Sequence, residues 1–257
     1  SELHGELTAG GTVWLINPNG VLIGSTGRIE TRSFIASTLN VSDSQFLENA
    51  ATFNLEGDST ATIHNLGNIT ATGGDVILVA RQVTNSNGIE AADGLVGLAA
   101  GNNVEITLRD TSSSIVVQTA VEGVADGDGV THAGLIEAAR AELVAAGGNI
   151  YGMAVNVSGD ITAAGAPDVA PSIRLASEGG SIAVSGKLVA SSAGETDAGR
   201  IELNADRAEI RPGALLDVSG ESAGGTITLS SAADTPMSEL DVAGSAALRA
   251  NGENGNI

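Results

Sequence analysis

The sequence has no cysteine, one lysine and very few aromatic residues. Without cysteine the chain can form neither a disulfide framework nor a thiolate metal site. Aromatic residues are only 2% of the 257 residues, which excludes a large aromatic core and leaves few rings for stacking on sugars. Long apolar runs are also missing. No stretch approaches the roughly 20 residues of a membrane-spanning helix, so we do not expect the chain to span a membrane.

Positive charge is equally scarce. The chain has 11 Lys and Arg against 31 Asp and Glu, a formal net charge of −20. A surface this acidic repels phosphate backbones and anionic membranes through the same Coulombic force. We therefore expect no nucleic-acid partner.

The abundant residues favour short strands joined by tight turns. Hydrophobic residues make up 42% of the chain, mostly Ala, Val, Ile and Leu, and there are 35 Gly. Small and β-branched side chains with glycine corners suit this architecture. The segment 42–50 could form one short helix after a Ser/Asp cap.

A phrase built around isoleucine recurs through the later half of the chain. Its copies include GGNIYG (147–152), PSIRLA (171–176), GRIELN (199–204) and GTITLS (225–230). The aligned residues, about 23–30 positions apart, are Ile150, Ile173, Ile201, Ile227 and Ile257. This period is typical of one coil of a β-solenoid.

Within the coils, apolar and polar residues alternate. Segments 201–204 and 104–108 both place Ile, Leu or Val at every second position. The predicted fold is all-β: a right-handed parallel β-helix of about ten coils, with a small excursion near residues 40–62. A β-sandwich would instead show hairpin signals every 8–12 residues or so, without one phrase per coil.

The stretch 3–42 contains the tetrapeptide Asn17-Pro18-Asn19-Gly20 between two apolar runs. This stretch closely resembles the secretion domain of two-partner-secretion exoproteins, the filamentous haemagglutinin family. Further stretches that resemble family repeats are 67–108, 147–165 and 200–230.

The resemblance implies a domain organisation. Residues 1–110 would be the C-terminal part of a two-partner-secretion domain, and residues 111–257 would continue as β-helical repeats of an exoprotein shaft, truncated mid-coil. The family's N-terminal cap and signal peptide are missing from this sequence, which therefore reads as a piece of a longer polypeptide.

The resemblance also implies a location and partners. The chain would belong to a secreted adhesin at the bacterial cell surface, exported by an outer-membrane transporter that engages it through periplasmic domains. A host-cell, glycan or cell-surface receptor would be bound by regions outside this segment.

The tetrapeptide itself predicts a turn. Pro18 sets φ near about −65°, Asn19 tolerates the left-handed region, and Gly20 accepts positive φ. Asn17, Pro18, Asn19 and Gly20 are the candidate secretion motif, which either contacts the transporter directly or acts only by closing a corner of the coil.

No other group of residues indicates chemistry. Asp126 and Asp128 superficially resemble the start of a calcium loop, but Val130 stands where the next ligand is needed. His4, His64 and His132 lie on widely separated coils. We expect no catalytic residue, no metal site and no cofactor.

Few aromatic residues remain to be placed. Phe34, Phe46 and Phe53 are close in sequence and would hold the excursion on the helix flank, the alternative being a ligand groove. Trp14 alternates out of phase with its apolar neighbours, so it would face outward.

Two other functions remain open. The chain could be a purely structural extracellular stalk or filament protein. It could less readily be a polysaccharide-degrading enzyme, since such enzymes also use parallel β-helices. That chemistry needs either paired carboxylates at a cleft or basic groups that bind uronate carboxylates. A concave face with two carboxylates and an arginine beside an exposed ring would indicate it.

Overall fold

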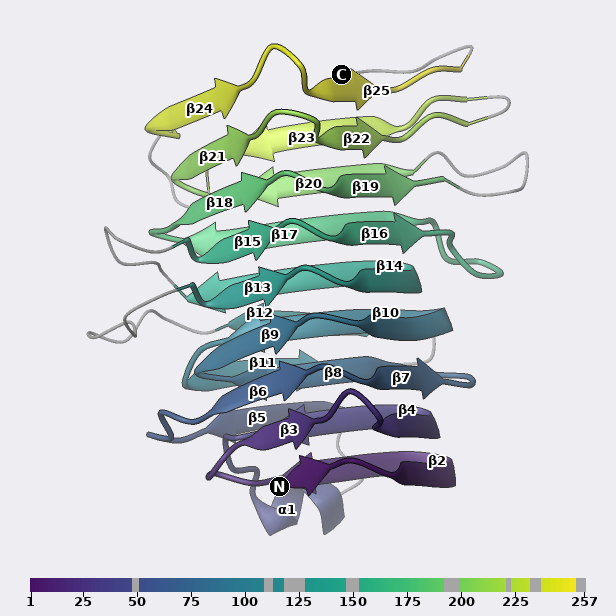
Figure 1. Ribbon diagram of the computed structural model, residues 1–257, viewed down its shortest axis with the longest axis vertical. Helices are drawn as coiled ribbons and strands as arrows, with labels where there is room; N and C mark the ends of the chain where they lie inside the picture. The colour runs from purple at the N-terminus through teal and green to yellow at the C-terminus, as the bar shows by residue number, and fades with distance from the viewer. Residues whose placement is uncertain are drawn as a thin grey trace.

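The computed structural model is a stack of coils that rises along one axis, with the two termini at opposite ends (Figure 1). It describes residues 1–47, 51–108, 113–117, 128–146, 153–191, 199–220, 223–231 and 237–252. Strands of successive coils pair in parallel on every face of the stack. The expected parallel β-helix is confirmed.

One face is a nine-stranded sheet that takes one short strand from each coil. Its strands are β1 (Glu2–Leu3), β3 (Val21–Ile23), β6 (Thr62–Asn65), β9 (Gln82–Asn85), β13 (Val130–His132), β15 (Val155–Val157), β18 (Ser181–Val184), β21 (Arg207–Ile210) and β24 (Glu239–Val242). The described residues therefore form nine coils, close to the number expected.

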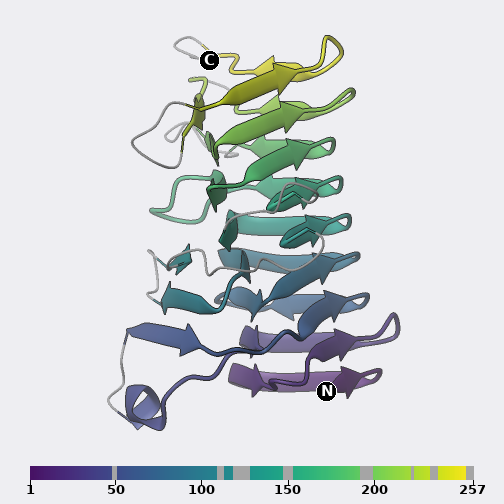
Figure 2. The same ribbon diagram turned by 90° about the vertical axis from the view of Figure 1, so that its left-hand side faces the viewer.

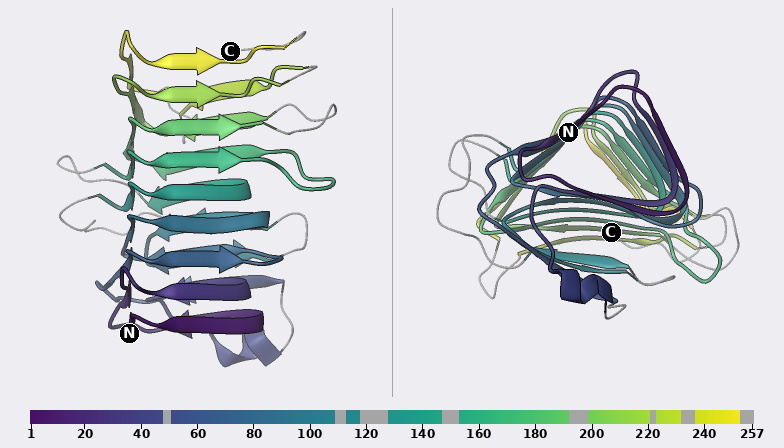
Figure 3. Two further views of the ribbon diagram at one scale, coloured as in Figure 1. Left: turned by 45° about the vertical axis from the view of Figure 1, so that its right-hand side comes forward. Right: turned by 90° about the horizontal axis from the view of Figure 1, so that it is seen from below.

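The other two faces belong to a 13-stranded sheet. The second-face strands, some of which bend into the third face, are β2 (Glu6–Ile16), β4 (Arg28–Ser37), β7 (Asn68–Ala71), β10 (Gly88–Ala100), β14 (Leu135–Ala146), β16 (Asp160–Ala163), β19 (Lys187–Ala190), β22 (Leu215–Asp217) and β25 (Ala247–Arg249). The third face adds β8 (Val76–Ala80), β17 (Ser172–Glu178), β20 (Arg200–Asn204) and β23 (Thr226–Ser230). Seen along the axis, the coils outline a triangle (Figure 3).

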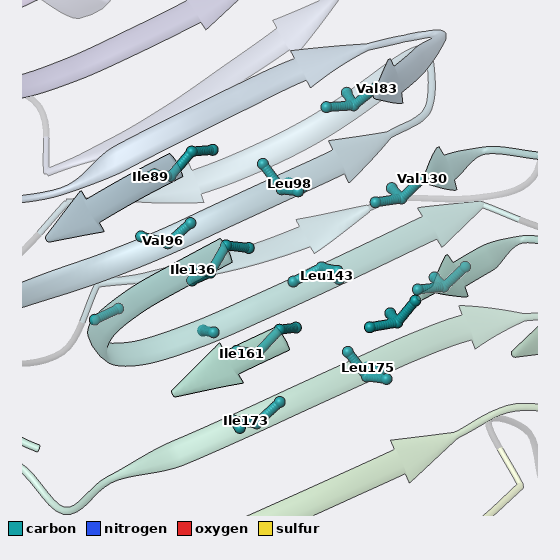
Figure 4. Packing of buried hydrophobic residues seen from close by; sticks show 14 of the residues in the cluster. Val83, Ile89, Val96, Leu98, Val130, Ile136, Leu143, Ile161, Ile173 and Leu175 are labelled. Carbon is teal, nitrogen blue, oxygen red and sulfur yellow. The ribbon is translucent and has the colours of Figure 1, made fainter. Parts of the chain in front are cut away.

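Register stacks like on like inside the helix. Ile89, Ile136 and Ile161 lie directly above one another, as do Leu98 and Leu143 (Figure 4). All five side chains are buried in the main core. Because each coil adds only about 4.8 Å, narrow aliphatic columns fill this core without aromatic rings.

The predicted isoleucine column is confirmed only in part. Ile173, Ile201 and Ile227 pair in register on β17, β20 and β23. Ile150 and Ile257 lie outside the described residues. The neighbour of Ile173 on the preceding coil is Ala141 of β14, not Ile150, because β14 continues through its bend onto the third face.

A second layer covers the outside of the third face over the early coils (Figure 2). It is an antiparallel sheet of β5 (Thr52–Glu56), β11 (Asn103–Thr107) and β12 (Ser114–Val117), with the helix α1 (Asp43–Leu47) beside it. Outward-facing Ile35 and Ile77 pack against Leu55, Ile106 and Ile115 in a second buried core. We call this sheet and helix the outer layer.

The outer layer corrects one sequence prediction. The excursion near 40–62 is present, and α1 forms within the segment expected to be helical. However, the alternating segment 104–108 is not part of a coil: β11 is the central strand of the outer layer, between β5 and β12. Alternation indicates a half-buried strand, but it does not say which sheet the strand belongs to.

The aromatic residues are also arranged differently from the prediction. Phe34 is fully buried inside the coil and belongs to the main core. Trp14 does face outward, and it takes the place expected for Phe34. Its ring centroid lies 5.0 Å from Phe46 and 4.9 Å from Phe53, so the cluster joins the outer layer to the first coil.

The register predicts the effect of a charge in a core column. Ile201 is 0% exposed, so Ile201→Asp buries an unpaired carboxylate and should destabilise the protein by about 3 kcal/mol or more. Glu202→Ala, one residue along on the outer surface, should cost less than about 1 kcal/mol. Urea denaturation measures both. Equal losses of unfolding free energy in the two variants would contradict the assignment of Ile201 to the inside and Glu202 to the outside of the coil.

Gly97 gives a matching prediction for the outer layer. A Cβ built at Gly97 overlaps the Cδ1 of Ile115 on β12. Gly97→Val should therefore push β12 outward and cost about 1–3 kcal/mol. Gly10→Ala, where a Cβ meets nothing within 4 Å, is the control. Thermal melts compare the two, and an unchanged melting temperature for Gly97→Val would mean that Ile115 does not seat there.

Candidate functional site

Residues Asn17–Gly20 form a tight turn between β2 and β3. The Gly20 N–H donates to the Asn17 carbonyl oxygen at 3.0 Å, and the Asn19 N–H donates to the Asn17 side-chain oxygen at 3.0 Å. Asparagine at the first position, proline at the second and glycine at the fourth are the residues a type I turn prefers. The predicted turn is present.

Of the two residues of the turn that can take a positive φ, only Gly20 does, with a φ of 99°, and Asn19 stays outside the left-handed region. A Cβ at Gly20 would lie 3.1 Å from the Thr62 carbonyl oxygen of β6. Glycine is thus required by both conformation and space, because the next coil passes directly over it.

Hydrogen bonds from three parts of the chain anchor the turn. The Asn17 N–H donates to the Ser37 carbonyl oxygen at 2.9 Å, and the Ser59 hydroxyl donates to the Pro18 carbonyl oxygen at 2.6 Å. The Ser1 backbone nitrogen donates to the Gly20 carbonyl oxygen at 2.7 Å. The turn is therefore held rigidly by its own coil, the coil above and the end of the excursion.

The anchoring hydrogen bonds leave two side chains of the turn at the surface. Pro18 and Asn19 are exposed, whereas Gly20 is buried. Beside them lies an open groove of ≈ 440 Å³, lined in part by Glu2, Asn19 and His64. The turn therefore presents two uncharged, rigidly held side chains on the surface of a strongly acidic protein.

The remaining candidate residues have structural roles. The Asp128 carboxylate accepts hydrogen bonds from the Met153 N–H at 2.8 Å and the Asn156 side chain at 2.7 Å, while Asp126 lies outside the described residues. In the described part of the chain, no three His, Asp or Glu side chains gather as a metal site would require.

Two carboxylates and an arginine do meet on the third face, where Glu142, Arg174 and Glu202 occupy one column. The Glu142 carboxylate lies 3.6 Å from the Arg174 guanidinium and accepts the Ile115 N–H of β12 at 3.2 Å. Burial raises the pKa of Glu142, partly opposed by Arg174 and by that hydrogen bond. The described aromatic rings, including Trp14, lie on other coils, so this column fastens the outer layer rather than forming a sugar site.

Comparison with protein families and with other proteins agrees with this picture. Residues 1–189 match the family described as the TPS secretion domain. The Heme/hemopexin-binding protein of Haemophilus influenzae is 32% identical over 147 residues, which are 52% of this chain and 16% of that protein.

A solved structure shares the fold. The crystal structure of the HMW1 secretion domain from Haemophilus influenzae matches with a TM-score of 0.79 and 23% identity, over 96% of this chain and 66% of that one. The crystal structure of the filamentous hemagglutinin secretion domain is less similar, with a TM-score of 0.45 and 16% identity, over 96% and 71%. The chain spans under two thirds of the HMW1 structure and a small part of the curated relative.

The fold and the family match together define the class of protein, a β-helical secretion domain. The chain belongs to the TPS secretion domain family. It is part of a bacterial exoprotein that is exported by two-partner secretion to the cell surface or the medium. Domains of this family engage an outer-membrane transporter. No described helix is long and apolar enough to span a membrane.

The turn predicts an unequal sensitivity to substitution. Gly20→Ala forces an alanine to φ near 99° against the Thr62 carbonyl, which should cost about 1–3 kcal/mol. Asn19→Ala removes an exposed side chain and keeps the backbone N–H of the turn, so it should change stability by less than about 0.5 kcal/mol. Chemical denaturation of both variants tests this, and equal losses would contradict the described turn.

Proposed function

We propose that the turn at Asn17–Gly20 is contacted directly by the periplasmic domains of the outer-membrane transporter during export. The observation that carries this is the contrast between a turn fixed by four backbone-anchoring hydrogen bonds and the exposure of Pro18 and Asn19. A rigid exposed feature binds with little loss of conformational entropy. Because Pro18 and Asn19 are uncharged, they can be desolvated at a contact more cheaply than the carboxylates around them.

We further propose that residues 1–110 are the C-terminal part of the secretion domain proper and that residues 111–257 form a structural shaft, whose first coils lie within the family match to residues 1–189. The change in the outer surface of the third face supports it. Early coils present Ile35 and Ile77, which need the outer layer, whereas later coils present Arg174 and Glu202, which water can solvate. A shaft of repeated coils can extend by adding further coils.

Adhesion to a host cell, a glycan or another surface receptor is proposed for regions of the exoprotein outside this segment. The relative with the heme/hemopexin-binding name shares only a small part of its length with this chain, which gives no reason to place a heme site here. The second candidate function is a purely structural stalk, and the repeated coils of residues 111–257 support it equally well.

An enzymatic role is the least supported reading. The families matched are secretion domains of exoproteins. The arginine–carboxylate column on the third face is partly covered by β12 and carries a hydrogen bond to its backbone. We therefore propose that the segment serves export and architecture, with no catalytic residue, metal or cofactor.

Binding to the transporter's purified periplasmic domains tests the contact. Asn19→Ala and Pro18→Ala should each weaken binding about tenfold, which corresponds to about 1.4 kcal/mol, and should lower secretion. The melting temperature should stay unchanged for Asn19→Ala and fall only slightly for Pro18→Ala, which loses a fixed φ. Ser25→Ala, an exposed residue in the next turn of the same coil, is the control. If both variants bind like wild type while Gly20→Ala loses binding, the turn acts only by shaping the coil.

A further inference from the structure

Three polar side chains are buried in an apolar row inside the helix. Asn65, Asn85 and His132 end the strands β6, β9 and β13, pair in register and are each 0% exposed. The same corner is filled by Val157 and Val184 on the following coils. A buried polar row must complete its hydrogen bonds or destabilise the fold.

The direction of the hydrogen bonds along this row is fixed by the backbone. The Gly67 N–H, which can only donate, bonds to Asn65 Oδ1 at 3.1 Å. Asn65 Nδ2 must therefore be the donor to Asn85 Oδ1, at 2.8 Å. Asn85 Nδ2 in turn donates to the Asn87 carbonyl oxygen at 3.0 Å and faces His132 Nδ1 at 3.1 Å.

This chain of donors determines the state of the imidazole. Because Asn85 Nδ2 is a donor, His132 Nδ1 has to accept and cannot carry a proton. His132 Nε2 lies 3.1 Å from the Asp160 carbonyl oxygen, which can only accept, so Nε2 carries the hydrogen. The row is complete only around a neutral histidine.

A second proton on His132 has no place in this arrangement. It would set Nδ1–H against the Nδ2–H of Asn85 in a region closed to water. Rotating the Asn85 amide would bring its oxygen against the Asn87 carbonyl oxygen and its nitrogen against the Asn65 amide nitrogen. The rotation would therefore only move the mismatched pair of groups to the neighbouring coil. The conflict can be relieved only by opening the corner.

Few charges act on the imidazole. Burial lowers the pKa of His132, and Asp160 of β16 raises it by its backbone hydrogen bond and its charge. The Asp160 carboxylate itself lies 3.8 Å from Lys187 Nζ of β19. Glu90 of β10 and Glu137 of β14 are exposed on the outside of the helix.

We propose that the row Asn65–Asn85–His132 is a proton-sensitive latch, which keeps the corner of β6, β9 and β13 closed while His132 is neutral and lets it open in acid. The latch is linked to the turn at Asn17–Gly20, since β6 runs from its contact with Gly20 to Asn65. Its test is independent of the transporter.

The direction of the pH dependence follows from which state of the corner, open or closed, binds the proton more tightly. The opened corner exposes His132, which then titrates near about 6.5, whereas the closed form binds the proton only at lower pH. The closed state therefore has its full stability above about pH 6.5 and loses it as the pH falls toward the lowered pKa. In that window the opening equilibrium should rise about tenfold per pH unit.

Amide hydrogen exchange of the whole chain between about pH 5 and 7.5, corrected for intrinsic rates, measures this opening. The Gly67 and Ala133 amides, bonded to Asn65 Oδ1 and the Asn85 carbonyl, report the latch. The Arg211 amide, bonded to the Val184 carbonyl at the same corner of a later coil, is the internal control. Opening should increase in acid at the first two amides and stay flat at Arg211.

His132→Asn is the matched variant, because a third asparagine can accept from Asn85 without a titratable group. It should remove the acid dependence at Gly67 and Ala133, whereas His64→Asn, at an outward position of β6, should leave it intact. Equal pH slopes at the latch and at Arg211 in the wild type would overturn the proposal. So would a slope that persists in His132→Asn. If that variant fails to fold, the wild-type comparison alone decides.

Discussion

Stacking in register is the constraint on which this structure depends. Each inward side chain has the same position of the next coil about 4.8 Å above and below it, so neighbours must be alike or complementary. Isoleucines and leucines meet their own kind in the apolar columns. At the polar side chain of Asn65, the row continues with Asn85 and His132, which complete the hydrogen bonds. Because of the same stacking, each side chain of the polar row depends on the adjacent coils for its hydrogen bonds.

The outer faces follow from the same stacking. On the early coils the outward column of the third face is apolar at Trp14, Ile35 and Ile77, and a second layer is needed to cover it. On later coils that column becomes Glu142, Arg174 and Glu202. Burial at the edge of the layer raises the pKa of Glu142, so acid favours the burial of this side chain, whereas it opposes the closed state of His132. The two groups respond to acid in opposite senses.

Sequence patterns predicted the parts of the fold that repeat or turn. The inward direction of Ile201 and the turn at Asn17–Gly20 could be predicted because alternation and turn preferences depend only on neighbouring residues. Segment 104–108 was misplaced because a strand's periodicity does not say which sheet pairs with it. One signal of the outer layer was overlooked: the run 76–80 is apolar at every position, which indicates burial on both faces.

The polar row was also missed, although the sequence carried it. VTNSNGI (83–89) and VTHAGLI (130–136) align position by position, which puts Asn85 and His132 in one column. Each histidine by itself indicates no more than a possible metal ligand, and the relation appears only when the two segments are aligned. Hydrogen-bond direction, however, needs the coordinates, because it is set by the backbone groups of Gly67 and Asn87.

The central functional claim is that the turn at Asn17–Gly20 meets the transporter. Site-specific photo-crosslinking in secreting cells tests it most directly, with the reactive side chain at Asn19 or, as a control, at the exposed Lys187 of a later coil. The account predicts a crosslink from position 19 to the transporter's periplasmic domains and none from position 187. Crosslinks of equal yield from both positions, or from position 187 alone, would contradict it.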